Sequence, residues 1–311
     1  MANRPWTARR DDAGVRLDKF LAAPERLGSR ARAADALARG KVFVNDREAS
    51  LADAAARLVD GDEVRVWMDR PGSGRARLSL GELRDLPIVY EDAAIVVLNK
   101  PAGILAVPLE RRGEARSVFE DLKAHLKKHR GGRPLVVHRI DRDTSGLVVF
   151  AKNLRAQAAL KAQFKRRLPE RVYLAVVYGR PTPPEGTWRD RLVWDERSLV
   201  QKETHPRDPA GKAAISRYRV VESLGEASLV EVRLVTGRRN QIRIQARLRG
   251  HTLVGEKRYV YGPDALRRID FPRQALHAHR LAFVHPATER RMEFEAPVPE
   301  DMKRLIARLR P

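Results

Sequence analysis

The stretch of the chain best suited to carry chemistry is a polar loop between two apolar runs. Residues 138–146 read HRIDRDTSG, and they lie between the runs 135–137 (LVV) and 147–150 (LVVF). Two acids, two hydroxyls and a glycine predict a loop of fixed conformation, because short polar side chains bond their own backbone in turns. A carboxylate such as Asp141 in this setting can cap its turn, bind a cation, or act as a nucleophile or base.

A calcium loop is the first alternative to consider. The first, third, fifth and sixth positions of the EF-hand pattern are matched by Asp141, Asp143, Ser145 and Gly146. The twelfth position requires a bidentate Glu, but Lys152 stands there. A cation at that position opposes a bound ion, so we exclude a calcium site.

A metal site built from histidines is also disfavoured. Alternation along a strand puts His277 and His279 on one face, and His285 follows later in the chain. No third ligand stands at a spacing typical of zinc sites. The sequence therefore predicts no metal.

The loop and its surroundings resemble the RluA family of pseudouridine synthases. The family's catalytic motif is usually written HRLDxxTSGL, and residues 138–147 read HRIDRDTSGL, with Ile140 for Leu as the single change. Further motifs stand in the family's order: LNKPAG (98–103), RVYLA (171–175), TGRRNQIR (236–243), LHAH (276–279) and HP (285–286). The resemblance covers about residues 86–300 and implies an enzyme that isomerises uridine to pseudouridine in RNA.

The resemblance also implies which residues act. Asp141 would be the carboxylate beside the sugar, acting as nucleophile or base. A carboxylate in a dry pocket tends to take up a proton, so it needs a cation to stay ionised; Arg243 is the implied partner. Tyr173 would pack against the target base and shuttle a proton at C5. From the residues alone, Arg243 is equally consistent with a solvated arginine, and Tyr173 with a core tyrosine of a strand.

The target base must leave its stack, at a cost of about a few kcal/mol. Arg139 and His138, directly before Asp141, are placed to fill the vacated space or to hold the flipped nucleotide.

Three positions depart from the family's pattern. Asn240 and Gln245 stand where the family most often has His, and Glu256 stands where it usually has Asp. Asn and Gln still donate and accept hydrogen bonds. A structural role for these positions therefore survives, whereas a role for ionisable histidines does not.

Alternating helices and strands must position these residues within 86–311. Apolar runs predict strands at 95–98, 135–137, 147–150, 172–178 and 228–235. Ser117 and Glu120 form a capping box for one helix, and apolar residues recur every four positions from Ala156 to Leu168 in another. We expect an α+β catalytic domain of pseudouridine synthase type, with a mixed, mainly antiparallel sheet.

A separate small domain is expected at residues 13–70. A short helix (16–22), a helix capped by Ser29, and strands at 41–45 and 63–67 resemble the alpha-L RNA-binding module shared with a small-subunit ribosomal protein. The resemblance implies phosphate contacts, which position RNA without reading its sequence, from Arg30, Arg32, Arg39 and Lys41. An ordinary α+β domain with a solvated basic helix is the alternative. Residues 1–12 are expected to be a flexible lead-in and 71–85 a linker, marked by Pro-Gly-Ser-Gly.

Composition bounds the partners. Lys and Arg outnumber Asp and Glu by 62 to 40, a net charge of +22 that favours polyanions. The absence of cysteine excludes disulfides, and the lack of a signal-like N-terminus or a long apolar run favours a cytoplasmic protein without a membrane partner.

We expect a monomer that needs no cofactor, because the isomerisation has no redox step. We expect its substrate to be large-subunit ribosomal RNA, with transfer RNA as the alternative. A non-catalytic RNA-binding assembly factor is one alternative function. A DNA-binding protein is another, disfavoured because the sequence shows no helix-turn-helix or zinc pattern.

Overall fold

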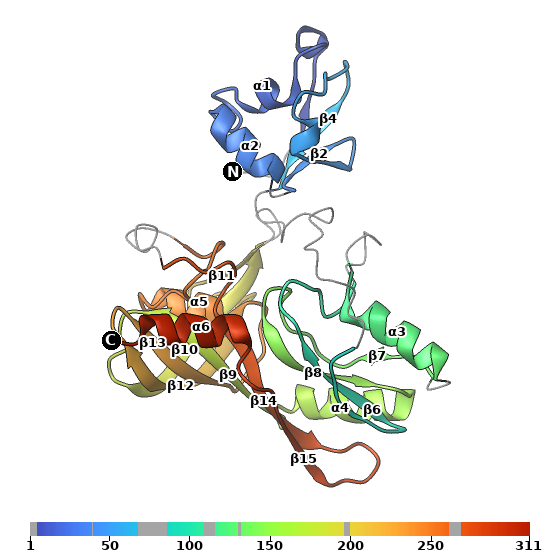
Figure 1. The fold of residues 1–311 in the computed structure, drawn as a ribbon, viewed down its shortest axis with the longest axis vertical. Coiled ribbons are helices and arrows are strands. Elements are labelled where there is room, and N and C mark those ends of the chain that lie inside the picture. Colours follow the sequence, from blue (N-terminus) through green and yellow to red (C-terminus); the bar gives the residue numbers. More distant parts are fainter. Residues whose placement is uncertain are drawn as a thin grey trace. The chain divides into compact units, whose positions relative to one another are not determined.

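The computed structural model describes residues 5–38, 40–67, 86–108, 116–129, 132–195, 200–260 and 269–311. The chain divides into two compact units (Figure 1). The first comprises Met1–Glu82 with Trp194–Val200, and the second comprises Leu83–Val193 with Gln201–Pro311. The expected linker at 71–85 lies outside the described residues.

In its described part, the N-terminal unit is a small antiparallel sheet packed against two helices (Figure 1). Its strands follow the order β1-β4-β2-β3. They are β1 (Trp6–Thr7), β2 (Val42–Val44), β3 (Arg47–Ala49) and β4 (Glu63–Val66). Helices α1 (Leu17–Leu21) and α2 (Arg30–Ala38) bury Phe20 and Leu37 in the shared core. Ser29 caps α2 as expected, since its Oγ accepts a hydrogen bond from the Arg32 amide at 3.2 Å.

The expected flexible lead-in is wrong for residues 6–12. Trp6 lies opposite Val64 and Thr7 opposite Glu63 in an antiparallel pair. Residues 10–12 then form a turn of 3₁₀ helix. Pairing with β4 gives these backbone groups hydrogen-bond partners, which charge composition alone does not reveal.

The C-terminal unit is built on one large sheet. Its described strands run in the order β11-β10-β12-β13-β9-β14-β8-β6-β5, with β15 beside β14 and β7 beside β8. Their bounds are β5 (Ile88–Glu91), β6 (Ile95–Lys100), β7 (Leu135–Val136), β8 (Ser145–Ala151), β9 (Glu170–Tyr178), β10 (Glu185–Asp195), β11 (Val200–Glu203), β12 (Lys212–Leu224), β13 (Ala227–Leu234), β14 (Leu276–Val284) and β15 (Arg291–Glu295). The helices are α3 (Val118–Lys128), α4 (Leu154–Lys165), α5 (Gln241–Leu248) and α6 (Glu300–Leu309).

The expected α+β class with a mixed, mainly antiparallel sheet is confirmed. Strands β8 and β14 pair in parallel, whereas β6–β8, β9–β13, β9–β14, β10–β12 and β12–β13 pair antiparallel. Among the described residues, no helix is long and apolar enough to cross a membrane.

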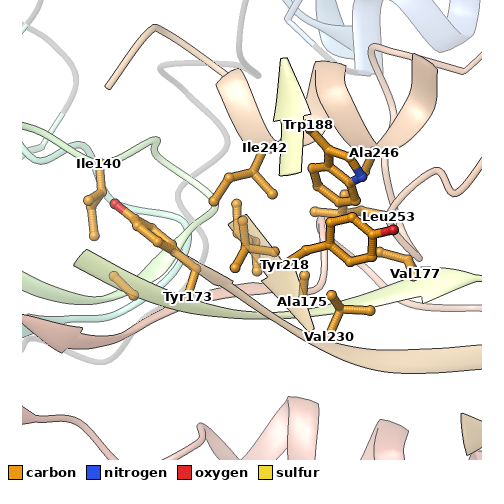
Figure 2. Close-up of a cluster of buried hydrophobic side chains, with 13 residues drawn as sticks. Ile140, Tyr173, Ala175, Val177, Trp188, Tyr218, Val230, Ile242, Ala246 and Leu253 are labelled. Atoms are coloured by element: carbon orange, nitrogen blue, oxygen red, sulfur yellow. The ribbon is translucent and has the colours of Figure 1, made fainter. Parts of the chain in front are cut away.

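Strand β9 lies at the centre of this sheet and is buried on both faces. Tyr173, Ala175 and Val177 pack in one cluster with α5, and Leu174 and Val176 pack in another with α6. This alternation follows from the period of two along a strand. Figure 2 shows the first cluster, in which Tyr173 lies between Ile140 and the residues around α5. The face of β9 that carries Tyr173 therefore meets both the polar loop and α5.

Two local expectations differ from the structure. Helix α4 ends at Lys165, and Leu168 lies beyond it, 53% exposed, because the backbone turns at Arg167 with a φ of 62°. Ser145 and Gly146 begin β8 rather than ending the loop. Gly146 has a φ of 109°, and a Cβ there would lie 2.2 Å from the Ala278 carbonyl oxygen. Glycine is therefore required where β8 pairs with β14.

Candidate active site

The side chains of Asp141 and Arg243 meet, although they come from distant parts of the sequence. Asp141 lies in the loop between β7 and β8, and Arg243 lies in the first turn of α5. Arg243 Nη1 is 3.3 Å from Asp141 Oδ2. The Asp141 side chain is 25% exposed and makes no other hydrogen bond to a described residue. It therefore does not cap its own turn, and part of the carboxylate stays accessible to a substrate.

Main-chain contacts fix the loop that carries Asp141. The fully buried Lys100 ammonium donates to the carbonyl of Arg142 at 2.8 Å and to two carbonyls of its own turn. Arg273 Nη1 donates to the carbonyl of Asp143 at 3.1 Å. Burial lowers the pKa of Lys100 to about 7, against the opposing effect of nearby carboxylates. The loop is thus held at both residues that follow Asp141.

Arg243 is itself held by a second carboxylate. Glu256, whose side chain is fully buried, accepts from Arg243 Nε and Nη2 at 2.7 Å each. Burial alone would lower the pKa of Arg243, but the Glu256 carboxylate outweighs burial and raises it. Burial would likewise raise the pKa of Glu256, and Arg243 lowers it instead. The pair is therefore ionised, and it leaves Nη1 directed to Asp141.

The three departures from the family's pattern have structural roles here. Asn240 adopts a left-handed φ of 54°, accepts from Arg243 Nη1 at 3.0 Å and donates to the Tyr259 hydroxyl at 2.8 Å. The Gln245 amide, fully buried, donates to Asp190 at 2.7 Å and accepts from Ser216 at 2.7 Å. Glu256 was missed as a site residue because nothing in its spacing points to Arg243.

Tyr173 packs against Ile140, the residue before Asp141. It is 8% exposed, and its hydroxyl lies towards Ile140, the residue before Asp141 (Figure 2). Burial raises the pKa of Tyr173 to about 12, Arg171 opposing and Asp141 reinforcing that effect. The phenol is therefore neutral at ordinary pH. Its hydroxyl has no hydrogen-bond partner among the described residues, which leaves it available to a ligand.

The two residues before Ile140 lie in different environments. Arg139 is exposed. His138 Nε2 accepts from the Val149 amide at 3.1 Å, and its ring stacks on Phe164 with centroids 4.6 Å apart. Burial, reinforced by the charge of Arg171, lowers the pKa of His138 to about 3. His138 is therefore neutral, and its ring forms part of the packed wall.

The basic residues expected to bind RNA in the N-terminal unit differ in their exposure. Arg30 and Arg32 are exposed on α2, and Arg30 lies 3.7 Å from Asp18. Lys41 is partly buried. Arg39 lies outside the described residues.

The histidines considered as metal ligands make other contacts. His277 Nδ1 lies 2.9 Å from Ser145 Oγ, and both His277 and His279 bond the Ala296 carbonyl. Within the described part of the chain, no three His, Cys, Asp or Glu side chains are grouped as metal ligands would be.

Comparison with known proteins identifies the family of the chain. The family described as "RNA pseudouridylate synthase" matches residues 94–248. An RNA pseudouridine synthase of Bacillus subtilis, YlyB, is 39% identical over 98% of this chain and 97% of its own length. "Ribosomal large subunit pseudouridine synthase D" of Zymomonas mobilis is 37% identical over 95% of this chain and 94% of its own length.

A solved structure shows the same fold. Human RNA pseudouridylate synthase domain containing 4 superposes with a TM-score of 0.59 at 21% identity, covering 71% of this chain and 92% of that one. The relatives from Bacillus subtilis and Zymomonas mobilis each match nearly the whole chain at more than 30% identity, so the family assignment does not depend on the likeness of the folds. The chain belongs to the RluA family of RNA pseudouridine synthases and is an enzyme that isomerises uridine to pseudouridine.

Proposed function

We propose that this enzyme isomerises specific uridines of large-subunit ribosomal RNA, with Asp141 as the nucleophile or base and the target base flipped out of its helix. The contact between Asp141 and Arg243 carries the proposal, because it keeps a partly exposed carboxylate beside a cation. The substrate is inferred from relatives in Zymomonas mobilis and Pseudomonas aeruginosa, each named "Ribosomal large subunit pseudouridine synthase D".

The reaction breaks the glycosidic C–N bond of uridine and joins the same sugar carbon to C5 of the base. C5 loses a proton and N1 gains one, so atoms and electrons balance without an oxidant or reductant. Asp141 acts at the sugar or takes its proton, and it must be ionised to do either. Arg243 supplies the fixed positive charge that favours that ionised form.

Residues near Asp141 contact the flipped base and fill the space that the base leaves in the RNA helix. Tyr173, neutral and lacking a hydrogen-bond partner among the described residues, packs on the flipped uracil and assists proton movement at C5. Arg139 is exposed two residues before Asp141 and fills the gap that the base leaves. His138 supports this wall through its stacking on Phe164.

We propose that the N-terminal unit is an alpha-L RNA-binding module that increases affinity for the substrate. The helix α2 presents Arg30 and Arg32 to solvent, and Arg39 and Lys41 follow at its end. Such side chains contact phosphates and fix the register of RNA without reading its bases. We further propose that the enzyme is a monomer and that it acts in the cytoplasm, where ribosomal RNA is assembled into ribosomes.

The test combines mapping in cells with an assay in solution. Pseudouridines are mapped in ribosomal and transfer RNA from cells with and without the gene. Purified enzyme is then given unmodified transcripts of bacterial large-subunit ribosomal RNA with tritium at C5, and tritium release is measured. Loss of defined ribosomal sites, reproduced in solution, is expected. Loss only of transfer RNA sites would overturn the ribosomal assignment.

A further inference from the structure

Arg171 is a cation without an assigned partner near the active site. It precedes Tyr173 by two residues on β9, so the two side chains leave the same face of the strand. The residue is partly buried and its Nε is fully buried. Within the described part of the chain, the Arg171 guanidinium makes no hydrogen bond and no ion pair.

Among the described residues, an aromatic ring and a glycine lie near this guanidinium. It lies 5.7 Å from the centroid of the Phe164 ring, on which His138 stacks. It also lies against Gly237: a Cβ built there would be 2.4 Å from Arg171 Nη1. Gly237 therefore leaves room for the guanidinium, and no carboxylate of the described residues pairs with it.

An unpaired guanidinium in partial burial is unfavourable. Burial lowers the pKa of Arg171, yet an arginine keeps its proton at any physiological pH. The desolvation cost is recovered only when an anion with matching acceptors binds. The planar fork of arginine fits two oxygens of a phosphate in a bidentate manner.

The position of Tyr173 indicates which phosphate is within reach. The charges of Asp141 and Arg171 both act on the pKa of Tyr173, the first raising it and the second lowering it. If the sugar of the target lies at Asp141 and its base on Tyr173, Arg171 faces the adjoining backbone. We propose that Arg171, in the space left by Gly237, binds an RNA backbone phosphate next to the flipped nucleotide. This inference rests on the function proposed above.

The test is the salt dependence of RNA binding by the full-length chain. Affinity for an unmodified transcript of bacterial large-subunit ribosomal RNA is measured between 50 and 200 mM salt for wild type, Arg171→Met and Arg171→Lys. Methionine keeps an apolar stem against Phe164 but removes the charge. Losing one phosphate contact should reduce the slope of log affinity against log salt by about 0.7–0.9, and affinity at 0.1 M by roughly fivefold to tenfold. Arg171→Lys should keep most of the slope.

Gly237→Ala provides a second, charge-neutral variant. The backbone at Gly237 does not need a positive φ, so alanine is accepted and the guanidinium must move. The same loss of slope is expected. In the Arg171→Met background Gly237→Ala should add nothing, because both act on one contact. If Arg171→Met alone fails to fold, Gly237→Ala decides the question.

The control is Arg310→Ala, which removes the same charge from an exposed arginine that already pairs with Glu222 at 2.7 Å. Its slope should match wild type. Unchanged slopes in well-folded Arg171→Met or Gly237→Ala would overturn the inference, as would a fall in turnover without a change in slope, which indicates contact with a neutral base. If the proposed function is wrong, the wild-type enzyme forms no product, and this result differs from an unchanged salt slope in the variants.

Discussion

The geometry of the candidate site depends on how the Arg243 guanidinium divides its hydrogen bonds between two carboxylates. Arg243 uses Nε and Nη2 for the buried Glu256 and leaves Nη1 for the partly exposed Asp141. Three main-chain amides also donate to Glu256, from residues 257, 258 and 259. Glu256 is therefore a positioning residue that holds Arg243 towards Asp141.

Replacing Glu256 tests this role. Glu256→Ala leaves the Arg243 charge buried without its main partner, and removal of one member of a buried ion pair costs about 3–5 kcal/mol of unfolding free energy. Glu256→Asp, which restores the residue usual in the family, should keep the pair and most of the activity. Denaturant titrations and single-turnover rates measure the two effects.

The matched control for Glu256 is Glu300→Ala. Glu300 is 68% exposed and lies 3.7 Å from Lys303, so its removal should cost well under about 1 kcal/mol. A Glu256→Ala protein with wild-type stability and turnover would contradict the positioning role.

How much of the site could be predicted varies with the residue. The resemblance selected Asp141 and Arg243, and the structure brings them into contact. The resemblance marked position 256 only as a departure from the usual Asp, and its contact with Arg243 was missed, because thirteen residues in a loop follow no helical or strand spacing. His138 was predicted to fill the vacated space or to hold the flipped nucleotide. Its neutral, stacked state depends on Phe164, a contact that sequence patterns do not contain.

At the scale of elements, strand β9 connects the parts of the site. Its alternating side chains pack against α5 on one face and α6 on the other, and β14 and β13 flank it. Apolar runs predicted β6, β8, β9 and β13. The long strands β10 and β12 carry charged residues at many positions, so their strand character depends on pairing with each other.

The contact of His277 in β14 with Ser145 in β8 leads us to predict how the stability of the protein changes in acid. His277 is fully buried and lies between Ser145 Oγ and the Ala296 carbonyl. Burial lowers its pKa from 6.5 to about 4, so the folded state holds His277 neutral where the unfolded chain binds a proton. Its contribution to stability is present above pH 6.5 and is lost as pH falls towards 4.

The expected slope is up to about 1.4 kcal/mol of unfolding free energy per pH unit in that window. His277→Gln, which keeps one donor and one acceptor, should be less stable at pH 7 but should show a flatter dependence below pH 6.5. Denaturant titrations at pH 4.5 to 7.5 measure both proteins. Parallel pH profiles would show that His277 is not the group responsible.

At the scale of the whole molecule, charge is the dominant feature. The net charge of +22 with 6% aromatic residues favours electrostatic binding over stacking. If about six phosphates are contacted, affinity for RNA should fall by about a thousandfold between 50 and 200 mM salt. A flat response in a filter-binding titration would contradict this view of recognition.

The division into two units predicts the effect of a deletion. Removing residues 1–74 should leave a folded catalytic unit, because the cores around β9 and around α3 and α4 are formed by residues after 85. Binding should weaken while turnover of bound RNA is kept. An insoluble or molten product would show that the boundary is wrong, and unchanged affinity would show that the N-terminal unit does not bind RNA.

The rate of pseudouridine formation by Asp141→Asn tests the role of Asp141 most sharply. Asparagine keeps the shape of the side chain but removes the negative charge that the proposed mechanism requires. Under single-turnover conditions, product should fall to background, while affinity for the RNA should hold or increase because a negative charge near phosphates has gone. Substantial product formation by a well-folded Asp141→Asn enzyme would contradict the assignment of Asp141 and the mechanism built on it.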